Sequence, residues 1–145
     1  MGSLKTSIHT TINTINRDDW NGCICNKDGE EDPFLTYEFF KILESSGSIG
    51  KGSGWQPFYI LFLNNDLVIG IVPGFLKSHS QGEYVFDHSW ADAFQRAGGN
   101  YYPKLQVAVP FTPVTGERIF IRNGYKEKNI SEIISKLKDI ITSNR

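Results

Sequence analysis

Apolar residues recur every three or four positions in three stretches of the chain, which predicts three amphipathic helices. The first follows Asp32-Pro33, a helix cap with proline at the first helical position, and stops at Gly47. The second covers 89–97, where Ser89 and Asp92 have the spacing of a capping box. A shorter helix is predicted around Trp20, over 17–25. The third long helix shows the pattern most fully, and its apolar face carries Ile130, Ile133, Ile134, Leu137, Ile140 and Ile141.

Between the predicted helices, the spacing of apolar residues changes to the one that is typical of β-strands. Weak alternation over 6–15 predicts an edge strand, and the continuous apolar runs 59–63 and 67–72, joined by Asn64-Asn65-Asp66, predict a hairpin buried on both faces. Pro73-Gly74 marks a bulge or bend in its second strand. Further strands are expected at 83–86, 105–109 and 118–121. This order predicts one domain over 1–145, an α/β (α+β) sandwich with a mixed central sheet flanked by helices.

Composition narrows the function classes. The 145 residues include 15 basic and 16 acidic ones, and a net charge of -1 provides no global field for binding DNA. No run approaches the roughly 20 apolar residues that span a bilayer, and the polar start has no signal core, so a cytoplasmic location is expected. Residues 1–3 could equally be a vector remnant. Cys23 and Cys25 lack the spacing of a redox or zinc motif, which favours reduced thiols.

Two further patterns resemble functional sites, but a structural role is favoured for both. The glycine-rich loop 47–54 follows a helix and enters a strand, the reverse of a phosphate-binding loop, and is read as a flexible linker. His79, His88 and Asp87 could be combined into a metal site, but histidines in different loops do not define one. Structural hydrogen bonding is favoured for them, and no metal is expected.

The stretch 76–116 carries most of the candidate chemistry. It places polar and ionisable side chains in segments that connect the predicted strands and helix, where binding and catalytic residues tend to lie on a rigid scaffold. The side chains singled out are His79, Glu83, Asp87, His88, Asp92, Tyr101, Tyr102, Lys104 and Thr112. Asp92 is read first as the acid of the capping box.

Several runs are specific enough to suggest a family. They include Gly54-Trp-Gln-Pro57, Lys77-Ser-His-Ser80 and the run 101–116, Tyr-Tyr-Pro-Lys-Leu-Gln-Val-Ala-Val-Pro-Phe-Thr-Pro-Val-Thr-Gly. Through them the chain resembles the bacterial FemAB-like family of peptidoglycan biosynthesis or recognition proteins, from about Ile8 to the last helix. The resemblance implies a GNAT-like acyl-CoA N-acyltransferase fold, present as two tandem copies in that family. The chain would then be the first copy, incomplete at its C-terminal end.

The resemblance also implies a reaction. FemAB-like enzymes transfer an amino acid from aminoacyl-tRNA, and related GNAT enzymes transfer an acyl group from acyl-CoA, to an amine such as that of a peptidoglycan precursor. Neither donor is a resident cofactor. The amine must lose a proton and the developing oxyanion needs a donor. Asp87, Glu83 and His79 are the candidates for the catalytic base, with capping of the following helix an equal alternative for Asp87.

Substrate-binding candidates complete the expected site. Lys77, Lys104 and Arg118 could bind phosphates of the donor or acceptor, although ordinary surface behaviour is the alternative for each. Tyr101 and Tyr102 could stack on a base or sugar, with a place in the core the alternative for one of the two. Thr112, Thr115 and Gly116 follow a buried strand, where a GNAT fold usually receives the pyrophosphate of its cofactor, but the arginine-rich glycine signature expected for CoA is missing.

Three readings of the function stay open at this point. The chain could be an acyltransferase domain, a non-catalytic domain that binds a ligand or partner through the same loops, or an inactive fragment of a split gene. A missing strand would leave a sheet edge open, so self-association or binding of a complementing C-terminal fragment is expected.

Overall fold

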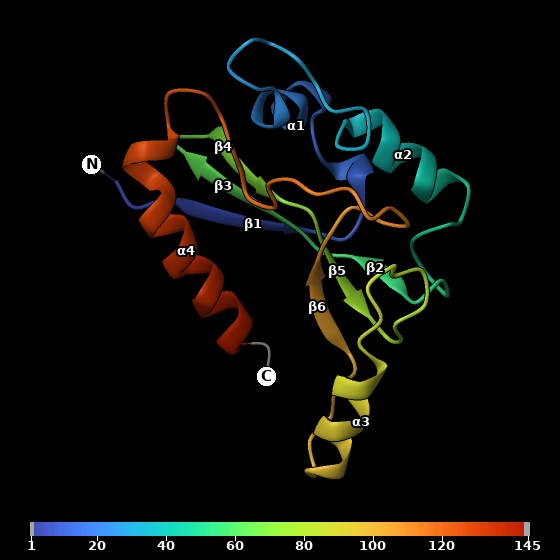
Figure 1. Ribbon diagram of the computed structural model, residues 1–145. Helices are drawn as coiled ribbons and strands as arrows, with labels where there is room; N and C mark the ends of the chain where they lie inside the picture. The colour runs from blue at the N-terminus through green and yellow to red at the C-terminus, as the bar shows by residue number, and fades with distance from the viewer. Residues whose placement is uncertain (1, 144–145) are drawn as a thin grey trace.

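The computed structural model describes residues 2–143, which form two antiparallel sheets and four α-helices (Figure 1). One sheet has the strand order β1-β3-β4-β7 and the other the order β2-β5-β6. In chain order the elements are β1 (Lys5–His9), a 3-10 turn (Ile12–Thr14), α1 (Arg17–Ile24), α2 (Tyr37–Ser45), β2 (Trp55–Pro57), β3 (Tyr59–Asn64), β4 (Leu67–Val72), β5 (Gly74–Lys77), α3 (His88–Arg96), β6 (Lys104–Val107), β7 (Phe120–Ile121) and α4 (Lys126–Ser143).

A single long hairpin runs through both sheets. Only Phe58 separates β2 from β3, and only Pro73 separates β4 from β5. At this bend the Phe58 amide donates to the Gly74 carbonyl at 2.8 Å, and a Cβ on Gly74 would lie 2.7 Å from the Phe58 carbonyl oxygen. The hairpin turn has positive φ at Asn65 and Asp66, as a type I′ turn requires. The predicted hairpin and the bend at Pro73-Gly74 are confirmed.

The two faces of the four-stranded sheet are covered by different helices. Alternate residues of β3 point to opposite sides: Tyr59 and Leu61 belong to the core beneath α1 and α2, while Ile60 and Phe62 belong to the core beneath α4. Figure 1 shows α4 on one side of this sheet and α1 and α2 on the other. Burial on both faces explains the continuous apolar runs of β3 and β4.

The start of α2 differs from the prediction. The helix begins at Tyr37 with Thr36 as its cap, because the preceding segment is tied to α1 instead of coiling. The Trp20 indole donates to the Leu35 carbonyl at 2.8 Å, and the Tyr37 amide donates to the Asn21 side chain at 2.9 Å. Asp32 accepts from the Phe34 amide within a turn. The cap expected at Asp32-Pro33 is therefore wrong.

Other expectations need correction. All strand pairs among the described residues are antiparallel, so the single mixed sheet is wrong. The expected strand at 83–86 is irregular chain, because Glu83 turns inward while the next three residues are exposed. The loop 47–54 is a hydrogen-bonded turn, in which the Gly50 amide donates to the Trp55 carbonyl at 2.8 Å, and not a flexible linker.

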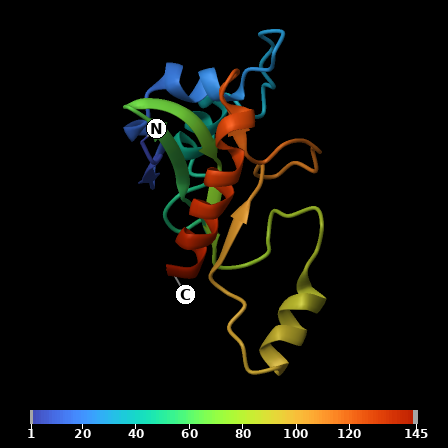
Figure 2. The ribbon, with the colours of Figure 1, turned by 90° about the vertical axis from the view of Figure 1, so that its left-hand side faces the viewer.

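The chain between β5 and β6 projects away from the sheets. It consists of residues 78–87, here called the strap, followed by α3 and the return to β6. Figure 2 shows α3 standing apart from the body at the end of this excursion. Helix α3 exists, but it begins at His88 with Asp87 at the cap position, so the capping box expected from Ser89 and Asp92 is wrong. The Asp87 side chain makes no capping hydrogen bond either.

Candidate functional site

The pairing of β5 with β6 places two lysines side by side. Lys77 and Lys104 are partners in the antiparallel register. Like charges directly opposite each other destabilise a strand pair unless other groups compensate them. Two carboxylates of the strap, Glu83 and Asp87, provide that compensation, so four charged side chains meet at the end of the three-stranded sheet.

Lys104 is the centre of this charged cluster. Its ammonium lies 3.0 Å from Glu83 Oε1, forms an ion pair with Asp87 Oδ2 and donates to the Ser80 hydroxyl at 3.2 Å. Burial alone would lower the pKa of Lys104, but the hydrogen bonds to Asp87 and Glu83 outweigh it and raise the pKa. The ammonium is also 5.3 Å from the centroid of the Tyr101 ring. Lys104 therefore fixes the strap to β6.

Asp87 is held as a carboxylate. Its Oδ2 accepts from the Tyr101 hydroxyl at 2.6 Å as well as from Lys104. Burial alone would raise the pKa of Asp87, but hydrogen bonds from Lys104, Ser80 and Tyr101 outweigh it and hold the pKa well below its usual range. A carboxylate stabilised in this way is a weak base. Its other oxygen, Oδ1, is buried and has no hydrogen-bond partner among the described residues.

Lys77 lies behind the strap and not at the surface. Its side chain is 0% exposed, and its ammonium donates to the Gln81 carbonyl at 2.8 Å. The ammonium also lies 3.5 Å from the centroid of the Trp55 ring and 3.6 Å from Glu83 Oε1. Burial lowers the pKa of Lys77 from 10.5 to about 8, and Glu83 offsets only part of that effect. A phosphate would not reach this ammonium with the strap in place.

Both ring nitrogens of His79 are engaged by the backbone. Its Nδ1 accepts from the Gln81 amide at 3.1 Å, and its Nε2 lies 3.2 Å from the Ser53 carbonyl, an arrangement that fits the neutral Nε2–H tautomer. The ring fills the space beside Gly54, where an added Cβ would lie 2.0 Å from Nε2. His79 therefore joins the strap to the turn before β2 and has no nitrogen left for a substrate.

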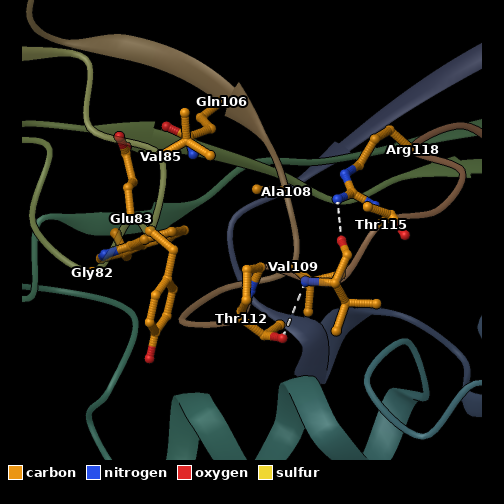
Figure 3. A pocket seen from close by; sticks show the side chains of 13 residues that line it. Gly82, Glu83, Val85, Gln106, Ala108, Val109, Thr112, Thr115 and Arg118 are labelled. Carbon is orange, nitrogen blue, oxygen red and sulfur yellow. Dashed lines mark hydrogen bonds between the residues drawn. The ribbon is translucent and has the colours of Figure 1, made fainter.

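A cavity of about 280 Å³ lies between the strap and the loop that follows β6. Figure 3 shows Gly82, Glu83 and Val85 on one side of it and Thr112, Thr115 and Arg118 on the other. Its lining comprises Trp55, Gly82, Glu83, Tyr84, Val85, Gln106, Ala108, Val109, Thr112, Pro113, Val114, Thr115 and Arg118. Four of the predicted site residues, Glu83, Thr112, Thr115 and Arg118, thus share one cavity.

The loop wall of the cavity is shaped by its own hydrogen bonds. Arg118 donates to the Val114 carbonyl at 2.8 Å, and Thr112 Oγ accepts from the Val114 amide at 3.4 Å (Figure 3). Arg118 also donates to the Glu117 carbonyl at 3.1 Å. These bonds close the loop on itself. Two of the five N–H groups of Arg118 stay available for a ligand once the bonds to Val114, Glu117 and Gly116 are counted.

The other predicted residues lie elsewhere. Lys77, Asp87 and Lys104 belong to the charged cluster. The Tyr101 hydroxyl donates to Asp87 of that cluster, and the Tyr102 hydroxyl is bonded to Ser80. Gly116 borders a different cavity of about 340 Å³, between the end of α1 and the start of α4. Within residues 2–143 no three His, Cys, Asp or Glu side chains gather as metal ligands.

Sequence reasoning missed several lining residues. Trp55 and Gln106 lie in runs that carry the family resemblance, yet neither was expected to face a ligand. Trp55 both lines the cavity and covers Lys77. Tyr84 and Val85 were expected in a strand and instead form part of the cavity wall.

Comparison with known families identifies the lineage. A family model for FemAB-like proteins, described as peptidoglycan biosynthesis/recognition, matches residues 11–145. The chain belongs to the FemAB-like family. Searches of curated proteins and of solved structures found no match.

Membership in this family implies a peptidoglycan-related function. In the part of the chain that the structure describes, no helix is long and apolar enough to cross a membrane.

Proposed function

We propose that this chain binds the amine-bearing part of a peptidoglycan precursor in the cavity and takes part in acyl transfer to that amine, as a GNAT-type domain. The observation that carries the proposal is the cavity itself, since it brings Glu83, Gln106, Thr112, Thr115 and Arg118 around one space. Its volume is just below the range of about 300–1,000 Å³ that is usual for ligand sites. It therefore suits one end of a larger molecule.

The reaction sets requirements that these residues can meet. The neutral amine attacks the acyl carbonyl carbon, the new C–N bond forms, and the bond to the ester oxygen or thioester sulfur breaks. The proton that the amine loses ends on the leaving group. Glu83 is the candidate to carry this proton, because it is the acidic residue among those that line the cavity. Gln106 and the two threonines supply donors for the oxyanion.

The acyl donor would be aminoacyl-tRNA or acyl-CoA, and both carry phosphates. Lys77 and Lys104 are turned inward to carboxylates, which leaves Arg118 as the cation beside the cavity. We therefore assign phosphate contacts to Arg118 and to backbone amides of its loop.

A second function is favoured by a specific observation. Glu83 is 94% buried at its side chain and faces two lysines, Asp87 is held by Lys104 and Tyr101, and both His79 nitrogens are bonded. With these groups engaged, the cavity would recognise a peptidoglycan fragment without transforming it. The two candidate functions share the ligand and differ in the fate of its amine.

The experiment measures binding and transfer separately. The probe for binding is a lysine-containing peptidoglycan stem peptide, titrated into the purified chain by calorimetry. Transfer is then measured by mass spectrometry of that peptide after incubation with charged tRNA or acetyl-CoA. Binding with transfer supports the first function, and binding without transfer supports the second. Absence of binding contradicts both.

Matched variants locate the binding site. Gln106→Leu removes a polar group from the cavity wall and is expected to weaken binding about tenfold, because a ligand donor or acceptor loses its partner. Gln95→Leu makes the same change at an exposed position of α3 and should bind as the wild type does. Equal affinities of both variants would place the ligand elsewhere.

A further inference from the structure

Lys77 is a buried cation with incomplete compensation. An ammonium has three protons to donate. Among the described residues it contacts the Gln81 carbonyl at 2.8 Å, the Trp55 ring at 3.5 Å and Glu83 Oε1 at 3.6 Å. The Glu83 carboxylate is closer to Lys104, at 3.0 Å, and is shared between the two lysines. Burying a charge is costly unless it is both paired and fully hydrogen-bonded.

The strap is what keeps water away from this ammonium. Gln81 and Glu83 both belong to the strap, and the Trp55 indole donates to the same Gln81 carbonyl at 3.1 Å. Lifting the strap would replace these contacts with water, in which an ammonium is better solvated. The charge on Lys77 therefore destabilises the closed position of the strap. Each contact of the ammonium is favourable by itself, but together the contacts do not replace its hydration.

The strap is also a wall of the cavity. Gly82, Glu83, Tyr84 and Val85 line the cavity and lie within the ten residues that cover Lys77. We propose that the strap is a lid over the cavity, and that the buried charge of Lys77 shifts the equilibrium of this lid toward its open form. The proposal concerns a conformational equilibrium and does not depend on which ligand the cavity takes.

The sign of the pH dependence follows from linkage. With the strap closed the pKa of Lys77 is lowered to about 8, and with the strap open the ammonium meets water and regains a value near 10.5. Between these values the open form binds more protons, so raising the pH favours the closed form. The charged groups that face Lys77 are Glu83 and Asp87 on the strap and Lys104 on β6. The pKa of Asp87 is lowered and that of Lys104 raised, so neither titrates in this window.

The test is amide hydrogen exchange of the intact protein, read by mass spectrometry and corrected for the intrinsic effect of pH. Peptides covering 78–87 should be about tenfold better protected at pH 9 than at pH 7. Peptides from β3 and β4 lie in the core and exchange only through unfolding, which also exposes Lys77, so their protection should rise by a similar factor. The strap peptides should be much less protected than these core peptides at both pH values, which identifies a local opening of the strap. A strap protection that is equal at both pH values would overturn the proposal.

Three variants separate a lid from an ordinary anchor. Lys77→Met removes the charge with little change of shape, so the strap should be more protected than in the wild type at pH 7 and indifferent to pH. Lys77→Arg keeps the charge at both pH values and should lose the gain at pH 9. Lys104→Met removes a well-compensated cation and should lower the protection at both pH values.

Lower protection in Lys77→Met than in the wild type at pH 7 would show that the ammonium is a net anchor, and the lid would be excluded. If Lys77→Met does not fold, the wild type and Lys77→Arg still decide between the two outcomes.

Discussion

The two ends of the long hairpin are stabilised by different forces. At the end formed by β3 and β4, helices α1 and α2 pack aromatic rings against the sheet, and Phe40 lies 5.2 Å from Trp20 and 5.8 Å from Tyr59, centroid to centroid. At the end formed by β5, Phe75 still belongs to the aromatic core, but the strap is held by Lys104 through Glu83 and Asp87 and covers the buried Lys77. Burial of apolar area is not directional, whereas buried charges require particular partners. The first end therefore gains its stability from non-directional apolar burial, whereas the second fixes one defined arrangement of the strap.

The largest expected effect tests the aromatic end. Phe40→Ala removes a side chain that is 0% exposed, and it should lower the free energy of unfolding by about 3–5 kcal/mol, because it leaves a cavity among rings that cannot all move in. The measurement is urea unfolding followed by tryptophan fluorescence. Ile42→Ala, in the same helix but 65% exposed, is the control and should change the free energy by less than about 0.5 kcal/mol. Similar losses for both variants would show that α2 is not fixed by its buried face.

A smaller effect is expected where the strap meets the turn before β2. Gly54→Ala places a Cβ 2.0 Å from His79 Nε2 and should displace the ring from the Ser53 carbonyl. Gly52→Ala is the matched control, since both glycines have positive φ but nothing lies within 4 Å of a Cβ at Gly52. The difference between the two variants in urea unfolding should be about 1–3 kcal/mol, the cost of lost hydrogen bonds in a partly buried site. Equal losses would mean that His79 does not secure the strap.

The aromatic end could be predicted from sequence, because apolar periodicity reports which face of an element is buried. The apolar runs 59–63 and 67–72 predicted the hairpin. The bend at Pro73-Gly74 could be predicted because proline has no amide hydrogen to donate to a neighbouring strand. The first residue of α2 could not be predicted from the local sequence. It depends on side chains of α1, Trp20 and Asn21, that hold the preceding segment through hydrogen bonds across 15 and 16 residues.

The charged end could be predicted only as a set of residue types. The stretch 76–116 was expected to carry the site, and it does supply most of the cavity. Which residues face the cavity depends on the register that pairs Lys77 with Lys104 and draws Glu83 and Asp87 inward. No local pattern encodes that register. The sequence suggests a surface position for Lys77 because its burial arises from the strap, of which residues 83–86 were expected to form a strand.

Asp87 gives the charged end a pH dependence of its own. Its pKa is lower in the folded protein than in the unfolded chain, so it contributes stability above pH 4 that is lost as the pH falls below that value. Asp87→Asn should reduce the free energy of unfolding at pH 7 by about 1–2 kcal/mol, because Lys104 keeps only one carboxylate. The variant should also lose less stability than the wild type between pH 4 and pH 2.5. Urea unfolding across this range is the measurement, and parallel curves for the two proteins would contradict the pairing.

The smallest effect concerns the two thiols at the end of α1, Cys23 in the last turn and Cys25 at the C-cap. Cys23 is buried, and burial raises the pKa of its thiol to about 11, so at pH 8 only about one molecule in a thousand carries the reactive thiolate. Cys25 is partly exposed. A thiol reagent such as DTNB should therefore modify one cysteine quickly in the folded protein and the second only on unfolding. Cys25→Ser should abolish the fast phase and leave stability nearly unchanged, whereas Cys23→Ser should keep it. A fast phase that survives in Cys25→Ser would show that the core beneath α1 opens far more often than its packing implies.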